Sequence, residues 1–194
     1  AGLEPNAEHS SRLVGQLAGL RSAADAITPY APEAGLEALN ALTHPLLQAE
    51  VETLRGTGLI FLNRSDEARS AFETALSQDA KHHRALTNLG NLALERGETD
   101  EAIVLYRRAL ELEPDFANAH HNLGVAYRRK GQVGRSVQSL RRAQGASQRK
   151  LRAEAREQLR DGVGGPNARK YGRWLLYALA AVVAYVLLRA QGVI

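Results

Sequence analysis

Apolar and small residues recur along the chain with a fixed period of 34 positions between residues 49 and 150. The pattern fills three consecutive copies, 49–82, 83–116 and 117–150, and the clearest of them reads HRALTNLGNLALERGETDEAIVLYRRALELEPDF. A fixed period of this length predicts helical hairpins that stack one on the next. We therefore expect an all-α solenoid at the centre of the chain.

Small residues mark the places where the two helices of each copy should cross. Two helices approach closely only where the side chains are small, and large residues fill the volume beside the crossing. A residue with positive φ is wanted between the two helices, which suits glycine and, next best, asparagine. The glycines aligned at the predicted crossings are Gly56, Gly90 and Gly124, and the residues between the helices are Asn63, Gly97 and Gly131.

These positions resemble the tetratricopeptide repeat (TPR) family, in which Leu-Gly, two alanines, an aromatic residue and a proline hold fixed places. The middle copy supplies Leu86, Leu89, Gly90, Ala102, Tyr106, Ala109 and Pro114, and departs from the family pattern mainly at Ala93. The third copy has Ser136 for alanine and Gln148 for proline. The first has Arg55 for leucine and Ala80 for proline. The resemblance implies a solenoid of three repeats that binds other proteins.

Residues 1–48 carry two further helical patterns, separated by a break that contains proline. The apolar residues of Ser11–Ile27 and of Glu33–Leu47 have helical spacing. Counted back one period, Ala34 and Ala41 fall on the small-residue positions of the repeat. The segment is either a degenerate fourth repeat that caps the solenoid or a plain helical hairpin that covers its end.

The C-terminal part predicts a capping helix, a linker and a membrane anchor. Residues 151–161 are basic and rich in helix formers, and 162–170 predict a linker because glycine and proline break helices. Within 171–194, the uncharged run WLLYALAAVVAYVLL spans only about 22 Å at ~1.5 Å per residue, and its continuation to Ile194 approaches the ~30 Å of a bilayer core. We expect a single transmembrane helix there; the alternative is a buried helix of a larger α-domain.

Charge is divided sharply along the chain. Residues 1–127 carry 10 basic and 18 acidic side chains, a net charge of −8, whereas residues 128–173 carry 14 and 3, a net charge of +11. Cations on the near side of a membrane helix keep that side in the cytoplasm and attract anionic lipid. Arginine outnumbers lysine 21 to 4, which favours a bacterial source and thus the bacterial inner membrane. The predicted membrane-surface residues are Arg149, Lys150, Arg152, Arg156, Arg160, Arg169, Lys170 and Arg173.

Little in the chain suggests catalysis or a cofactor. The absence of cysteine excludes disulfides, thiolate zinc sites and a cysteine nucleophile, and no protease, esterase or P-loop motif occurs. The pairs His82-His83 and His120-His121 point about 100° apart on a helix, so neither chelates a metal by itself. The basic run lacks the interleaved aromatic residues of nucleic-acid binders. We expect no enzyme activity, cofactor, metal, small-molecule substrate or nucleic-acid partner.

The TPR resemblance implies a concave groove lined by the first helix of each repeat. Asn88 and Asn122 take the same place in consecutive repeats, where a carboxamide could pair with the backbone of an extended peptide; the alternative is that Asn-Leu-Gly is only the family consensus. Thr53, Asn118 and Asn122 stand where chaperone-binding members carry basic residues, which disfavours an acidic C-terminal ligand. The predicted groove residues are Arg84, Thr87, Asn88, Asn91, Leu94, Asn118, His121, Asn122, Val125, Arg128 and Arg129, with Glu50, Thr53, Leu54, Thr57, Ile60 and Phe61 at the same places in the first repeat and Glu95 in the second.

Two hypotheses of function follow. The first is an accessory or assembly subunit of a larger membrane protein complex, which binds other subunits and contacts lipids through residues 171–194. The second is a stand-alone, tail-anchored adaptor that captures an extended peptide of a soluble partner in its groove.

Overall fold

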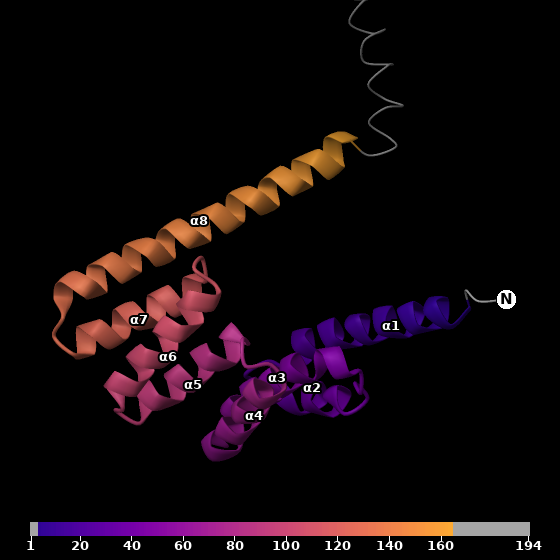
Figure 1. Cartoon of the computed structure of the whole chain (residues 1–194), viewed down its shortest axis with the longest axis horizontal. Coiled ribbons are helices and arrows are strands. Elements are labelled where there is room, and N and C mark those ends of the chain that lie inside the picture. Colours follow the sequence, from indigo (N-terminus) through magenta and orange to yellow (C-terminus); the bar gives the residue numbers. More distant parts are fainter. Residues whose placement is uncertain (1–3, 165–194) are drawn as a thin grey trace, which may run out of the picture. The chain divides into compact units, whose positions relative to one another are not determined.

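The computed structural model describes residues 4–164, with side-chain burial described for residues 10–159, and every regular element in this range is a helix (Figure 1). The chain divides into two compact units, Ala1–Ala146 and Ser147–Ile194. The elements in chain order are α1 (Glu4–Ala26), α2 (Pro32–Leu39), the short 3-10 helix η1 (Pro45–Leu47), α3 (Gln48–Phe61), α4 (Ser65–Gln78), α5 (His83–Glu95), α6 (Thr99–Leu112), α7 (Ala117–Arg129) and α8 (Val133–Gly164).

The three predicted repeats are helical hairpins, formed by α3 with α4, α5 with α6, and α7 with the first part of α8. Each hairpin crosses at the predicted glycine, because a Cβ there would lie 2.4 Å from the Phe72 ring at Gly56, 2.6 Å from the Tyr106 ring at Gly90, and 2.8 Å from Leu140 at Gly124. The connecting residues have the predicted positive φ, 58° at Asn63, 84° at Gly97 and 74° at Gly131. The sequence prediction of the three hairpins is therefore confirmed.

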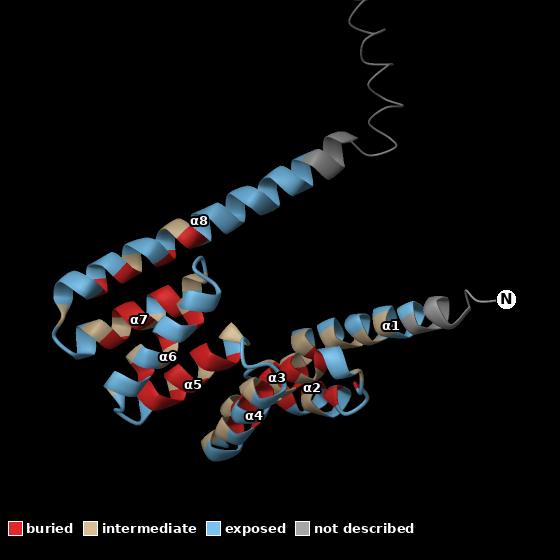
Figure 2. Cartoon of the chain, in the orientation of Figure 1, coloured by how far each residue is buried: buried red, intermediate tan, exposed pale blue. Residues whose placement is uncertain are grey.

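The core runs between the helices of each hairpin and continues from one repeat to the next (Figure 2). One cluster joins α3, α4 and α5 around Phe72, which is 1% exposed, and another joins α5, α6 and α7 around Tyr106, which is 0% exposed. Alanines beside these rings allow the helices to approach. In the first two repeats, the aromatic residue four positions after Ala68 or Ala102 is thus the centre of the core.

A recurring ion pair joins consecutive repeats. Asp66, in the first turn of α4, pairs with Arg96 at the end of α5 at 2.5 Å, and Asp100 in α6 pairs with Lys130 at the end of α7. The two pairs occupy equivalent positions, since both span 30 residues. All four side chains are at least 36% exposed, so each pair contributes at most about 1 kcal/mol. The pairs therefore add little to stability.

The N-terminal hairpin differs from the prediction in length and register. The second helix ends at Leu39 instead of Leu47, because the residue before Pro45 must be extended, and His44 has φ −68° and ψ 127°. Gln16 Oε1 of α1 accepts hydrogen bonds from the backbone N–H of Thr43 and of His44. The Gln16 side chain therefore gives hydrogen-bond partners to two backbone N–H groups of the loop that replaces the expected helical turns.

The small-residue positions predicted for this hairpin are wrong, and the small residue at the crossing lies one position after Ala34. Ala34 and Ala41 are exposed, whereas Gly35 is buried and a Cβ there would lie 2.4 Å from Ile27. Ala23, which is 0% exposed, lies opposite, with its carbonyl oxygen 2.9 Å from the same Cβ position. The hairpin thus has a repeat-like crossing. It lies one position from the predicted one, because the strict period of 34 residues does not hold between this hairpin and the first repeat. It packs onto the first repeat, where Leu36 covers Gly58.

The C-terminal boundaries also differ from the prediction. One continuous helix, α8, runs from Val133 to Gly164, so the third repeat and the expected capping helix are not separated at residue 150 and the linker does not start at 162. Arginine, alanine, glutamate, glutamine and leucine dominate residues 149–160, and strong helix formers carry a helix through isolated glycines. Residues 165–194, with the rest of the linker and the predicted transmembrane segment, lie outside the described residues. Among the described helices, none has the length and hydropathy to cross a membrane.

The positive φ of Gly97 gives a direct test of the connection between the two helices of the second repeat. We expect Gly97→Ala to lower the free energy of unfolding by about 1–2 kcal/mol, because an L side chain is strained at φ 84° although no atom would lie within 4 Å of its Cβ. The matched control is Gly15→Ala, inside α1 and equally open, which should raise the free energy of unfolding by about 0.5–1 kcal/mol. Urea titrations followed by circular dichroism measure both. Equal stability of the two variants would contradict the prediction.

Candidate functional site

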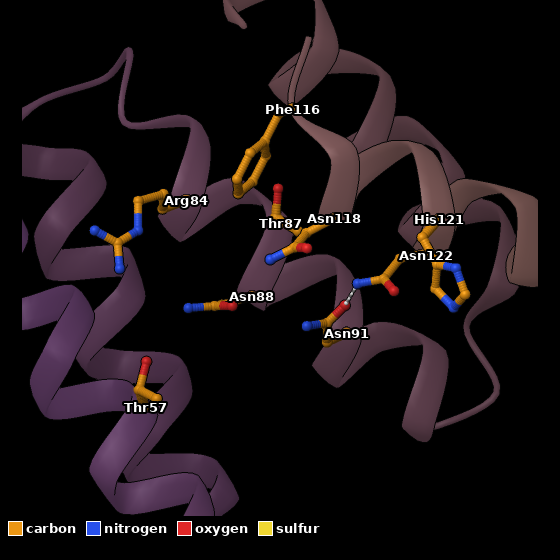
Figure 3. A pocket seen from close by; sticks show the side chains of 9 residues that line it. All are labelled: Thr57, Arg84, Thr87, Asn88, Asn91, Phe116, Asn118, His121 and Asn122. Atoms are coloured by element: carbon orange, nitrogen blue, oxygen red, sulfur yellow. Dashed lines mark hydrogen bonds between the residues drawn. The ribbon is translucent and has the colours of Figure 1, made fainter. Parts of the chain in front are cut away.

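The first helices of the three repeats share a polar hollow of about 400 Å³ (Figure 3). Thr57 reaches it from α3, and the remaining polar side chains come from α5 and α7. Phe116, which immediately precedes α7, adds an aromatic ring. The full lining is Thr57, Arg84, Thr87, Asn88, Asn91, Phe116, Asn118, His121 and Asn122.

Most of the groove residues predicted in the second and third repeats come together here. Five of those twelve do not line this hollow: Leu94, Glu95, Val125, Arg128 and Arg129. In the first repeat, Thr57 lines it, whereas Glu50, Thr53, Leu54, Ile60 and Phe61 do not. Leu94 is 7% exposed and belongs to the core cluster around Tyr106. Val125 packs against the same cluster. Arg128 is exposed in the last turn of α7. The predicted residues that do line it are Thr57, Arg84, Thr87, Asn88, Asn91, Asn118, His121 and Asn122.

Arg129 has a structural partner that the sequence did not indicate. Its guanidinium donates a hydrogen bond of 2.6 Å to the carbonyl oxygen of Leu94, in the last turn of α5. The last carbonyls of a helix lack partners within the helix and carry negative partial charge, so a cation stabilises them. Arg129 therefore links the second and third repeats.

Phe116 is the lining residue that the sequence analysis missed. It is the last residue of the middle copy, and its ring meets the His83 ring edge-on, with the centroids 4.7 Å apart. The one available signal was a large apolar residue directly after the Pro114-Asp115 turn, at a position outside the family's groove pattern.

The asparagines of the hollow divide into a bonded pair and two open side chains. Asn91 Oδ1 accepts a hydrogen bond from the Tyr106 hydroxyl at 2.8 Å. It also accepts one from Asn122 Nδ2 at 2.7 Å, the bond drawn in Figure 3. Asn122 is thus paired with Asn91 and not with its repeat equivalent Asn88. Within the described part of the chain, Asn88 and Asn118 make no side-chain hydrogen bond, so both keep a donor and an acceptor for a ligand.

Tyr106 fixes the orientation of this pair. Burial raises the pKa of the Tyr106 hydroxyl far above its ordinary value, so the group stays protonated and acts as a donor. Because both neighbours of Asn91 Oδ1 donate, the oxygen of Asn91 is turned toward them. Its amide nitrogen points to the other side, toward Asn88, as Figure 3 shows.

Arg84 is paired across the junction of the first and second repeats. Its guanidinium contacts Glu50, which occupies the same place one period earlier, and His82 Nε2 lies 3.3 Å from the other carboxylate oxygen of Glu50. Burial by itself raises the pKa of Glu50, but the nearby His82 ring and the charges of Arg84 and the histidines more than offset it, and the pKa lies below its ordinary value. The charge of Arg84 is therefore already balanced within the protein.

This carboxylate makes stability depend on pH. Since the folded-state pKa of Glu50 is lowered, the unfolded chain binds more protons near the ordinary glutamate pKa, and the stabilisation is complete above it. It is lost as the pH falls from about 4.5 through the lower folded pKa. We expect Glu50→Gln to be less stable than the parent at pH 7, with the difference shrinking below pH 4. Urea titrations across this range measure it, and a difference that is independent of pH would contradict it.

Two of the histidines considered as metal ligands, His83 and His120, contact protein groups instead. His120 is buried, with Nε2 2.8 Å from the carbonyl oxygen of Pro114, and His83 packs on Phe116. Burial, together with the nearby His82, lowers the pKa of His83. In the part of the chain that the structure describes, no three His, Asp or Glu side chains are placed to share a metal ion.

The predicted membrane-surface residues lie partly on α8. Arg149, Lys150, Arg152 and Arg156 are exposed there, and Arg160 belongs to the same helix. Arg169, Lys170 and Arg173 lie outside the described residues.

Comparison with known proteins identifies the repeats. Two family models match, one described as a TPR repeat over residues 90–131 and one as a tetratricopeptide repeat over residues 119–154. The peroxisomal targeting signal receptor of Yarrowia lipolytica is 33% identical over 79 residues, which is 41% of this chain and 13% of the receptor. That of Saccharomyces cerevisiae is 34% identical over 71 residues, 36% of this chain and 12% of the receptor. The chain thus matches about one eighth of the length of these relatives.

A solved structure shares the fold. The crystal structure of MamA superposes with a TM-score of 0.53 and 24% identity, over 62% of this chain and 71% of that one. At this identity the likeness concerns the fold alone.

Proposed function

Because this chain carries tetratricopeptide repeats, we propose that it is a non-catalytic protein-binding module whose groove holds an extended segment of a partner protein. We further propose that residues 171–194 anchor it in a membrane, as an accessory or assembly subunit of a membrane complex. The observation that carries the binding proposal is the pair of open carboxamides, Asn88 and Asn118, inside a hollow of about 400 Å³.

An extended backbone is the chemistry that these side chains match. The oxygen of a carboxamide can accept a hydrogen bond from a backbone N–H, and its NH₂ group can donate one to a backbone C=O. A helical segment uses its own backbone groups and leaves few of them for such pairing, whereas an extended segment presents them. The two curated relatives are receptors of a targeting signal by their names, and this supports peptide capture as the function of the shared repeats.

The charges of the polar hollow favour a partner segment that is not strongly acidic. Arg84 is balanced by Glu50, and Arg129 is directed to the Leu94 carbonyl. Apart from Arg84, no Asp, Glu, Lys or Arg side chain of the described residues lines the hollow. The hollow therefore recognises backbone more than charged side chains.

The membrane part of the proposal rests on composition. The run WLLYALAAVVAYVLL follows a basic segment, and a net charge of +11 over residues 128–173 favours an arrangement with the repeats on the cytoplasmic side, at the inner membrane of a bacterial cell. The exposed cations of α8 would lie near anionic headgroups. A stand-alone adaptor with the same groove is the second candidate, favoured by the fact that the hollow lies entirely within the unit Ala1–Ala146.

Purification of the tagged full chain from its own membranes in mild detergent, followed by mass spectrometry, tests the groove. We expect Asn88→Ala combined with Asn118→Ala to reduce the recovery of the bound partner about tenfold, since each net hydrogen bond contributes about 0.5–1.5 kcal/mol. The matched control is Gln138→Ala, which removes an exposed carboxamide of α8 that does not line the hollow. Equal partner recovery with both variants would refute the groove.

A second arm of the same experiment separates the two candidates. A chain truncated after Gly164 should lose its membrane subunits if it is held in a complex by its tail. A soluble partner that is retained by the truncated chain and lost with the asparagine variant would instead identify the stand-alone adaptor. Recovery of the truncated and full chains equally from the membrane fraction would contradict the anchor.

A further inference from the structure

A second, apolar pocket of about 160 Å³ opens beside the polar hollow. Its apolar wall combines side chains from three helices, Ile60 and Phe61 of α3, Phe72 of α4 and Leu92 of α5. The remaining lining is Thr57, Asn88, Asn91 and Glu95.

The two cavities form one continuous surface. Thr57, Asn88 and Asn91 line both of them, so a ligand that touches the asparagines is already at the mouth of the apolar pocket. Thr57 and Asn88 stand on facing helices in Figure 3, on the side of the hollow away from His121. The apolar pocket therefore extends the groove toward the first repeat.

The deep wall of this pocket is rigid. The Phe72 ring is 1% exposed and is pressed against Gly56, where a Cβ would lie 2.4 Å from it. Leu92 is 2% exposed and belongs to the same core cluster. Such residues cannot collapse into the pocket without disturbing the repeat crossing, so the cavity is present before a ligand arrives.

The size and lining of the pocket suit one apolar side chain. A volume of about 150 Å³ between aliphatic and aromatic walls is enough to hold a single benzene ring. Ile60 and Phe61 are only partly buried and leave apolar area in contact with solvent. Covering that area with an apolar ligand group is favourable.

Resting on the proposed function, we propose that the pocket selects the partner segment by one apolar side chain, from leucine to phenylalanine in size, while the asparagines hold the backbone. In an extended peptide, alternate side chains point the same way about 6.6 Å apart. The residue two positions from the apolar one therefore faces the polar hollow. The recognised segment carries an apolar residue and, two positions away, a polar one.

The probe is a set of fluorescent nonapeptide libraries with one fixed central residue, Leu, Phe, Ser, Asp or Lys, and randomised flanks. Binding to the full chain in detergent is measured by fluorescence anisotropy. We expect the Leu and Phe libraries to bind about tenfold or more tightly than the Ser, Asp and Lys libraries, from burial of one side chain. In a second library with central Leu, sequencing of retained peptides should show polar residues enriched two positions away.

Ile60 gives the matched pair of variants, because it lines the apolar pocket and not the polar hollow. Ile60→Gln should abolish the preference for Leu and Phe, whereas Ile60→Leu should keep it. Glu95→Gln should also keep it, because the proposed selection is by apolar contact and not by charge. Binding of apolar peptides to micelles is common to all variants and does not affect their differences, and thermal melts confirm that each variant is folded.

The outcomes separate this inference from the proposed function. If the libraries bind equally well but lose binding with Asn88→Ala and Asn118→Ala, the groove binds peptides and the apolar selection is refuted. If Leu and Phe are preferred equally by the parent and by Ile60→Gln, the preference arises elsewhere and the inference is again refuted. If no library binds the parent, both proposals fail.

Discussion

Replacing Tyr106 by alanine should lower the free energy of unfolding by about 3–5 kcal/mol, the usual cost of deleting a buried aromatic ring. The ring is 0% exposed and fills the space beside Gly90, where a Cβ would lie only 2.6 Å away. Its removal leaves a cavity between α5, α6 and α7 that the rigid helices cannot close. Urea titrations monitored by circular dichroism measure the loss.

The control Tyr106→Phe keeps the ring and removes only the hydroxyl. We expect it to cost about 0.5–1.5 kcal/mol, because Asn91 Oδ1 loses one of its two donors. It should also weaken capture of a partner in the groove, since the Tyr106 hydroxyl holds the Asn91 carboxamide in place. Equal stability of Tyr106→Ala and Tyr106→Phe would show that the ring does not support the repeat.

Gly56→Val should lower the free energy of unfolding by about 3 kcal/mol, the upper end of the usual cost of overpacking. Three carbons of the Phe72 ring lie 2.4–2.7 Å from the position of the new Cβ, and the ring is enclosed by the core of the first repeat. The ring can yield only if α3 and α4 move apart. The same urea titrations measure this variant.

The chain supplies both a matched control and a rescue for this substitution. Gly15→Val places the same side chain inside α1 with no atom within 4 Å of its Cβ, and its effect should stay within about 0.5 kcal/mol. Adding Phe72→Leu to Gly56→Val should recover part of the loss, because residues in contact couple by about 0.5–3 kcal/mol. Strict additivity of the two substitutions would contradict a clash at this crossing.

The repeat hairpins could be predicted because their determinants are local and periodic. Gly56, Gly90 and Gly124 each face a large residue 16 positions later, and this spacing follows from two helices joined by a short turn. The same reasoning failed for Ala34 and Ala41, because a strict period was imposed on a hairpin that has lost one residue of spacing. It failed again at residue 150, where the end of a repeat was inferred from the period although the local sequence continues as a helix.

The candidate site was predicted only as a face of each first helix. The sequence placed Asn88 and Asn122 as equivalents, yet Asn122 pairs with Asn91, which lies three residues after Asn88 on α5. Phe116 entered the hollow from outside the family's groove positions. Such contacts depend on how two hairpins pack against each other, and this packing cannot be predicted from the spacing of residues within one repeat.

The sequence by itself determined the three hairpins, their crossings, the left-handed residues at Asn63, Gly97 and Gly131, and the polar character of the groove face. These follow from the interval between small and large residues along one helix pair. Only the tertiary structure decided which asparagines remain open, that Arg84 and Arg129 are engaged by Glu50 and by the Leu94 carbonyl, and that an apolar pocket lies beside the polar hollow. Each of these depends on distances of a few ångströms between side chains of different repeats, which are set by the packing of helix against helix.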